Sequence, residues 1–201
     1  HVAGFNLRLA RRLKELTGRR VILYVQGRES VEKHRKHVEA GACDDVVDCG
    51  VFYNSCRDVF DDEHAVIARA RRLEDWCGSS FSELLMANRH AGRGFSLGGL
   101  YHPTSPFSRT VSYVQLLNGM SQTLEFWKRE IDSRPVALLL NGNKEAAVVC
   151  RAMKVPFRSF YAARVENRFY WAHDEFVAPP RLKEAYAECG EANREEVSLE
   201  Q

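Results

Sequence analysis

The chain has 201 residues, of which 28% are charged, yet its formal net charge is only +2. A chain of this length can bury a hydrophobic core as one domain without disulfides or a structural metal. Because no contiguous basic stripe is present, we expect no nucleic-acid partner.

The six cysteines include no C-x-x-C pair, and several lie in apolar runs, where cysteine behaves as a small hydrophobic residue. This usage indicates a reducing, cytoplasmic setting, and the spacing of Cys43, Cys49 and Cys56 fits no zinc template, so we expect no metal site. No apolar run approaches the ~20 residues of a membrane span, and no signal peptide is visible. Peripheral contact with a membrane stays open.

The chain opens on H-V-A-G-F-N and continues into an amphipathic helix, with Phe5, Leu9, Leu13 and Leu16 at helical spacing. One interpretation is that His1 to Asn6 is the turn after a first strand that is missing from the chain. A tag remnant at His1 would explain the same start, and both explanations stay open.

Strand and helix patterns then alternate. Arg20 to Gln26 contains the apolar, β-branched run V-I-L-Y-V, which is typical of a strand buried on both faces. A charged helix is predicted over Glu29 to Ala40, a second strand over Asp44 to Val51, and a capped amphipathic helix over Asp61 to Leu85.

The second half repeats the alternation. Its predicted elements are a long helix over Thr110 to Asp132, a buried strand over Val136 to Leu140, a helix over Lys144 to Met153, strands over Phe157 to Ala163 and Arg168 to Ala172, and a last helix over Arg181 to Cys189. The chain therefore predicts an α/β fold, a Rossmann-like three-layer sandwich around a mainly parallel sheet. We expect residues 1–180 to form this domain, and 181–201 a terminal helix and polar tail or the start of an interdomain linker.

The segment from Ala87 to Arg109 is the strongest candidate for a functional loop, because it holds glycines, histidines and arginines between two predicted helices. It follows no strand and matches no nucleotide-binding motif, and the chain contains no G-x-S-x-G elbow. A histidine can accept a proton from a hydroxyl group, and arginines grip carboxylate or phosphate. The candidates are His90 and His102 for catalysis and Asn88, Arg89, Arg93 and Tyr101 for substrate binding. The alternative is that these side chains only hold the loop backbone.

Two further polar turns follow predicted strands, at the sheet edge where α/β proteins bind ligands. Asn141 and Asn143 follow V-A-L-L-L, and they are candidates for substrate binding, although Asn143 alone would serve as a helix N-cap. Arg164 and Arg168 flank the other turn and are candidates of the same kind.

Four segments together resemble the amino-terminal half of bacterial capsular or surface polysaccharide biosynthesis proteins, which are similar to glycosyltransferases with two Rossmann-like domains. They are H-V-A-G-F-N, R-H-A-G-R-G-F-S-L-G-G-L-Y-H-P, V-A-L-L-L-N-G-N and A-R-V-E-N-R-F-Y-W-A-H-D.

The resemblance implies an acceptor-side domain that binds a sugar or glycan, supplies His90 or His102 as the base, and is inactive alone. The nucleotide-sugar donor would bind an absent carboxyl-terminal domain, and this chain would hold no cofactor. The alternative function is a non-catalytic α/β domain that binds a ligand or partner through the aromatic segment near Tyr170.

Overall fold

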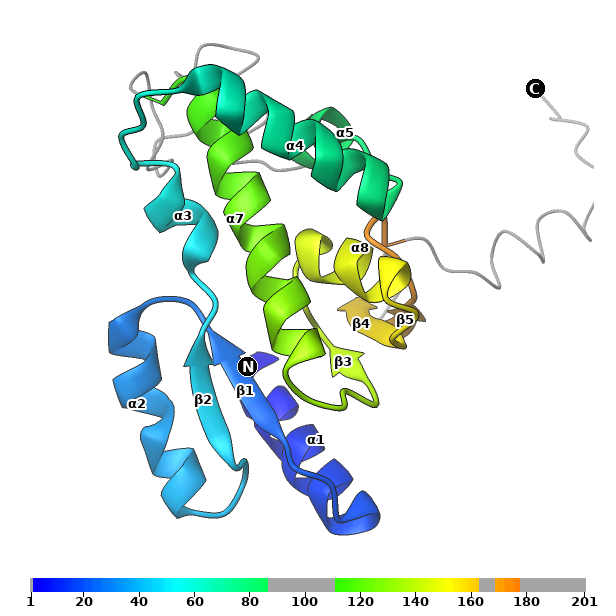
Figure 1. Ribbon diagram of the computed structural model, residues 1–201. Helices are drawn as coiled ribbons and strands as arrows, with labels where there is room; N and C mark the ends of the chain where they lie inside the picture. Colours follow the sequence, from blue (N-terminus) through cyan, green and yellow to red (C-terminus); the bar gives the residue numbers. More distant parts are fainter. Residues whose placement is uncertain (1, 87–110, 163–168, 178–201) are drawn as a thin grey trace, which may run out of the picture.

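The computed structural model describes residues 2–86, 111–162 and 169–177 as helices and short strands that alternate along the chain (Figure 1). In chain order they are α1 (Val2–Thr17), β1 (Ile22–Val25), α2 (Arg28–Glu39), β2 (Asp45–Asp48), α3 (Val51–Ser55), α4 (Glu63–Cys77), α5 (Phe81–Met86), α7 (Tyr113–Asp132), β3 (Leu139–Leu140), α8 (Lys144–Ala152), β4 (Phe157–Ala162) and β5 (Phe169–Ala172). This order confirms the predicted α/β class. None of these helices combines the length and the apolar character needed to cross a membrane.

The described strands form two small sheets. β1 and β2 pair in parallel, whereas β3, β4 and β5 form a second sheet in that order. β3 and β4 are parallel, but β4 and β5 are antiparallel, because the short connection over 163–168 is too brief for a parallel crossover. The expected continuous, mainly parallel Rossmann sheet is therefore not seen in the described part of the chain.

The hydrophobic core surrounds α7, which runs between the α4 and α5 region and the sheets (Figure 1). A capping box at its start joins Ser112 and Gln115, and its side chains Met120 and Leu124 are fully buried. α3, α4 and α8 all pack against this helix. Close approach of α3 depends on Gly119, where an added Cβ would lie 3.0 Å from the Phe52 carbonyl oxygen.

The helix predicted over Asp61 to Leu85 is two helices. α4 begins after the N-cap Asp62, as expected, but ends at Gly78, which takes a left-handed φ of 65°. Such a residue ends a helix because only glycine adopts this conformation without strain. The Glu74 carboxylate then accepts a 2.6 Å hydrogen bond from the amide of Phe81, at the start of α5.

Two other boundaries differ from the prediction. Helix α1 already includes residues 2–6, so the interpretation of His1 to Asn6 as a turn is wrong for the described part of that range. The strand predicted over Val136 to Leu140 shrinks to Leu139–Leu140, because only this short stretch pairs with β4. The predicted helix over Arg181 to Cys189 and the tail lie outside the described residues.

Candidate functional site

Most of the predicted site residues lie outside the described part of the chain. They are Asn88, Arg89, His90, Arg93, Tyr101 and His102 within 87–110, and Arg164 and Arg168 within 163–168. The structure does describe both flanks of the first segment. The hydroxyl oxygens of Ser82 in α5 and Tyr113 at the start of α7 are 3.3 Å apart, so the two helices that flank the segment in sequence meet at these side chains.

Asn141 lies directly after β3 with a left-handed φ of 53°. Its Nδ2 donates a 2.8 Å hydrogen bond to Oδ1 of Asn6 in α1, and its Oδ1 accepts a 2.7 Å bond from the amide of Phe160 in β4. Both ends of the amide group are therefore engaged within the chain. In this arrangement Asn141 joins α1 to the β3–β4 pair rather than presenting a free amide to a ligand.

Asn143 is the N-cap of α8, and its Oδ1 accepts a 2.9 Å hydrogen bond from the amide of Ala146. The alternative interpretation of Asn143, that it serves as a helix N-cap, is therefore confirmed. The turn before it is tightly packed, since a Cβ added to Gly142 would lie 2.9 Å from the Cβ of Ala146.

Asp48 closes the turns that follow β1 and β2. Its Oδ1 accepts hydrogen bonds of 2.8 Å from the amides of both Gly27 and Gly50. These two amides point to the carboxyl edge of the sheet, where an anionic ligand would otherwise bind them. The chain's own carboxylate thus satisfies the donors at this position.

A buried carboxyl group lies one residue into α8, close to the end of β3. Glu145 is 7% exposed, and burial raises the pKa of its carboxyl group. Burial, followed by the charge of the same carboxyl group, raises the pKa of the Tyr53 hydroxyl in α3. A buried carboxyl group with a raised pKa is a candidate general acid or base.

Glu145 and Tyr53 were not predicted as site residues. One signal for Glu145 was available, because it stands four residues before Val149 and so shares the apolar face of a helix rich in alanine and valine. A charged residue on such a face is buried when the helix packs. No sequence signal indicated Tyr53, since its approach to α8 depends on how α3 packs.

The cysteine thiols that the structure describes are free, and none is activated. Burial raises the pKa of Cys49 to about 11 and that of Cys150 to about 12. No three histidine, cysteine or acidic side chains group as metal ligands within the described ranges.

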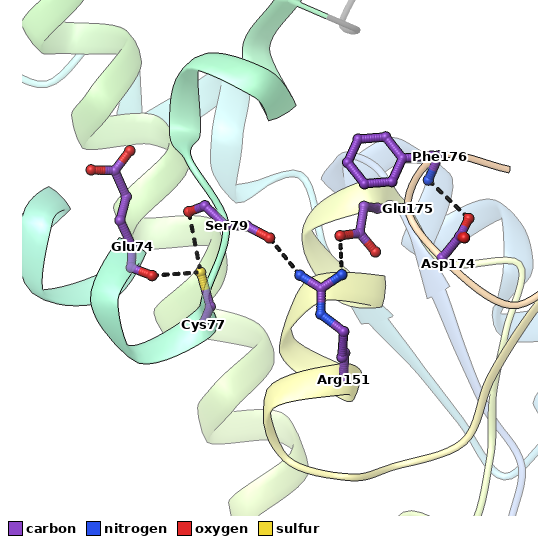
Figure 2. A network of polar contacts seen from close by, with 7 residues as sticks. All are labelled: Glu74, Cys77, Ser79, Arg151, Asp174, Glu175 and Phe176. Carbon is purple, nitrogen blue, oxygen red and sulfur yellow. Dashed lines mark hydrogen bonds and ion pairs between the residues drawn. The ribbon is translucent and has the colours of Figure 1, made fainter. Parts of the chain in front are cut away.

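A second polar cluster joins α8 to the segment after β5 (Figure 2). Arg151 donates hydrogen bonds to the buried carboxylate of Glu175 and to the hydroxyl of Ser79, which follows α4. Cys77 lies beside Ser79, with its Sγ 3.7 Å from the carbonyl oxygen of that residue. Because the Arg151 contacts tie together three segments distant in sequence, we interpret this cluster as a structural clamp.

Comparisons of the chain with protein-family models, with curated proteins and with solved structures found no match.

Proposed function

We propose that this chain is the amino-terminal, acceptor-side domain of a glycosyltransferase-like enzyme of surface polysaccharide biosynthesis. The domain is Rossmann-like and cytoplasmic, and it works together with a carboxyl-terminal domain that binds a nucleotide-sugar. The four sequence segments that resemble such proteins support this proposal, as does the mixed α/β fold with two parallel strand pairs.

One structural observation carries the proposal. Polar groups from separate segments gather where the parallel strands end: the turn at Asn141, the buried carboxyl group of Glu145, and Tyr53 in α3. Ligands of open α/β sheets bind at this edge. Sugar transfer needs a group that removes the proton from the acceptor hydroxyl, and a carboxyl group with a raised pKa at this edge suits that chemistry.

In this proposal His90 or His102 accepts the proton of the acceptor hydroxyl, while Arg89 and Arg93 hold an anionic group of the acceptor. Asn88 and Tyr101 in the same segment, with Asn141, Asn143, Arg164 and Arg168 at the other turns, complete the proposed acceptor site. The described hydrogen bonds of Asn141 and Asn143 give those two a supporting role in shaping the turn. Glu145 lies in the first turn of α8, directly after this turn, and its buried carboxyl group belongs to the same proposed site.

The test is sugar transfer by the whole protein, with the chain joined to its donor domain, against a panel of nucleotide-sugars. We expect His90→Ala or His102→Ala to abolish transfer while the melting temperature stays nearly unchanged. His64→Ala is the matched control, because His64 is an exposed residue in the first turn of α4, and it should leave transfer intact. Loss of folding in the loop variants, or tight nucleotide-sugar binding by the isolated chain, would contradict the proposal.

A second candidate function is a non-catalytic domain that binds a ligand or partner through aromatic side chains near Tyr170. Phe160 stacks on Phe5 and on Phe169, with ring centroids 4.8 and 4.7 Å apart, and Trp171 tilts against it at 5.2 Å. Phe169 is 55% exposed, so this stack presents an apolar surface. Under this alternative Phe169→Ala weakens ligand binding, whereas the histidine variants leave it unchanged.

A further inference from the structure

We infer that one additional parallel strand, an extended segment that immediately precedes α1, pairs with the free edges of both sheets. The strand order would then be β2, β1, added strand, β3, β4, β5, which converts two small sheets into one. The inference deepens the Rossmann-like fold proposed above and names the segment that completes it. It rests on two strand edges and on the position of α1.

The first edge belongs to β1. The carbonyl groups of Val21 and Val25 accept hydrogen bonds from the β2 side, from the amides of Asp44 and Cys49. Because alternate residues of a strand direct their backbone groups to opposite sides, those of the residues between them, 22 and 24, face away from β2. In the described part of the chain no other strand pairs with this edge.

The second edge belongs to β3. The amides of Leu139 and Asn141 donate hydrogen bonds of 3.0 and 2.8 Å to carbonyl groups on the β4 side. By the same alternation, the backbone groups of Leu140 face away from β4. Among the described strands β4 is the one neighbour of β3, so this edge is also open. Open edges of apolar strands invite pairing.

Helix α1 connects the two edges and sets the direction of the missing neighbour. Near its start, Asn6 accepts the 2.8 Å hydrogen bond from Asn141, at the carboxyl end of β3. Near its end, the Lys14 ammonium lies 2.7 Å from the carboxylate of Asp44, just before β2. The helix therefore runs from the carboxyl end of one sheet to the amino end of the other, antiparallel to the strands of both.

This direction identifies the occupant. A strand that precedes α1 must end at the carboxyl edge of the sheet, where α1 begins, and therefore runs parallel to β1. Strand, helix, parallel strand connections are right-handed in nearly all proteins, and consecutive strands of such units are usually neighbours. The added strand would therefore pair with the free edge of β1. The free edge of β3 would pair with the other side of the added strand.

Burial supports the same conclusion. The run from Val21 to Val25 is only half-buried, although its composition is that of a strand covered on both faces. Leu138 is 42% exposed in the run that leads into β3. The apolar stripe of α1 also lacks a full partner, since Phe5 is 41% and Leu16 is 65% exposed, and none of its described residues belongs to the core cluster. An added apolar strand would lie between these three surfaces.

The experiment uses a fusion protein in which an apolar segment of about six valine and isoleucine residues, a usual strand length, and then a glycine turn precede the chain. A matched control carries proline at alternate positions, because proline cannot donate strand hydrogen bonds. Amide hydrogen exchange is measured by NMR. We expect the amides of Ile22, Tyr24 and Leu140 to exchange at least about tenfold more slowly in the apolar fusion than in the proline control.

Equal protection of the Ile22, Tyr24 and Leu140 amides in the two fusions would overturn the inference. So would the absence of slower exchange in the apolar fusion, relative to the unfused chain, while the Leu124 amide in α7 stays protected. So would protection in the unfused chain that rises with its concentration, since the edges would then pair between copies. If the fusion does not fold, the same segment is added to the unfused chain as a free peptide, and absence of slowed exchange at saturating peptide also overturns the inference. The readout is backbone protection, so its failure is distinguishable from a failure of sugar transfer.

Discussion

Helices α7 and α1 are both amphipathic, but only α7 has a complete set of neighbours. Leu124 and Met120 in α7 are fully buried against α3, α4 and α8. In α1, by contrast, Leu13 is half-buried and Leu16 is 65% exposed. Contacts at its two ends hold α1: the Asn6–Asn141 hydrogen bond and the Lys14–Asp44 ion pair.

The difference shows that an apolar stripe encodes the tendency to bury a face but does not supply the surface that covers it. α7 finds that surface within the described chain, because three helices close around it. α1 spans the boundary between the two small sheets and contacts one residue next to a strand of each, Asn141 and Asp44. If this difference in packing is real, substitutions in α7 cost more stability than matched substitutions in α1.

The largest effect is expected for Leu124→Ala in α7. Removing a fully buried leucine side chain leaves a cavity in a tightly packed core, and we expect the free energy of unfolding to fall by about 3 kcal/mol. The matched variant Leu13→Ala in α1 should cost less than about 1 kcal/mol, because that side chain is only half-buried. Urea denaturation measures both, and equal losses would remove the proposed difference between the two helices.

Asn118→Ala tests the polar connection within the well-packed region. Asn118 is buried in α7, accepts a hydrogen bond from the guanidinium group of Arg69, and donates a 2.7 Å bond to the Ser55 carbonyl. Its loss leaves buried partners unsatisfied, so we expect a decrease of about 2 kcal/mol in the free energy of unfolding. Asn54→Ala on the exposed side of α3 is the control and should be nearly neutral. A similar loss for both variants would contradict the assigned role.

Glu145→Gln tests the buried carboxyl group through pH. Burial raises its pKa in the folded state above the ordinary 4.5, so the folded state binds more protons and wild-type stability falls as pH rises through that range. The glutamine variant lacks this decline. We expect it to match the wild type near pH 4 and to be more stable by about 1 kcal/mol near pH 7.

Thermal unfolding at the two pH values measures this difference. The control is Glu63→Gln, because Glu63 is also in the first turn of a helix but is exposed. If Glu145→Gln and the wild type are equally stable at both pH values, burial of the ionised carboxyl group does not lower the free energy of unfolding. If the proposed function is correct, Glu145→Gln also slows sugar transfer in the whole protein.

The smallest effect concerns the end contact of α1. The hydrogen bond from Lys14, followed by one from the Val21 amide, holds the pKa of Asp44 below its ordinary 3.8. Its contribution to stability is therefore present above that pH and is lost as pH falls through the lower folded value. We expect Asp44→Asn to cost about 0.5 kcal/mol at neutral pH and to flatten this acid dependence. If Asp44→Asn loses stability with falling pH as the wild type does, the acid dependence does not come from Asp44.

Elements with strong local signals were predicted closely. The charged helix expected over Glu29 to Ala40 is α2 (Arg28–Glu39), and the long helix expected to end at Asp132 is α7, which ends there. Capping chemistry and helical spacing act within a few residues, so they can be read without the fold. The same holds for the N-cap role of Asn143, which was the alternative considered for that residue.

Two features were not predicted, for different reasons. The break at Gly78 has a local cause, a left-handed glycine and the bond between Glu74 and Phe81, but neither interrupts the apolar spacing from which the helix was predicted. The role of Asn141 was not predicted because the partners of its amide group, Asn6 and Phe160, lie far away in sequence. The predicted histidine and arginine candidates within 87–110 stay predictions.

The sequence by itself determined the alternation of helix and strand, the caps, and the apolar faces, because these depend on side chains a few residues apart. Only the tertiary structure decided which faces found partners. It divided the described strands into two sheets, buried Glu145 beside Tyr53, and left one edge of β1 and one edge of β3 without a partner among those strands. Pairing and burial depend on contacts between residues far apart in the chain, and these contacts exist only once the elements have packed.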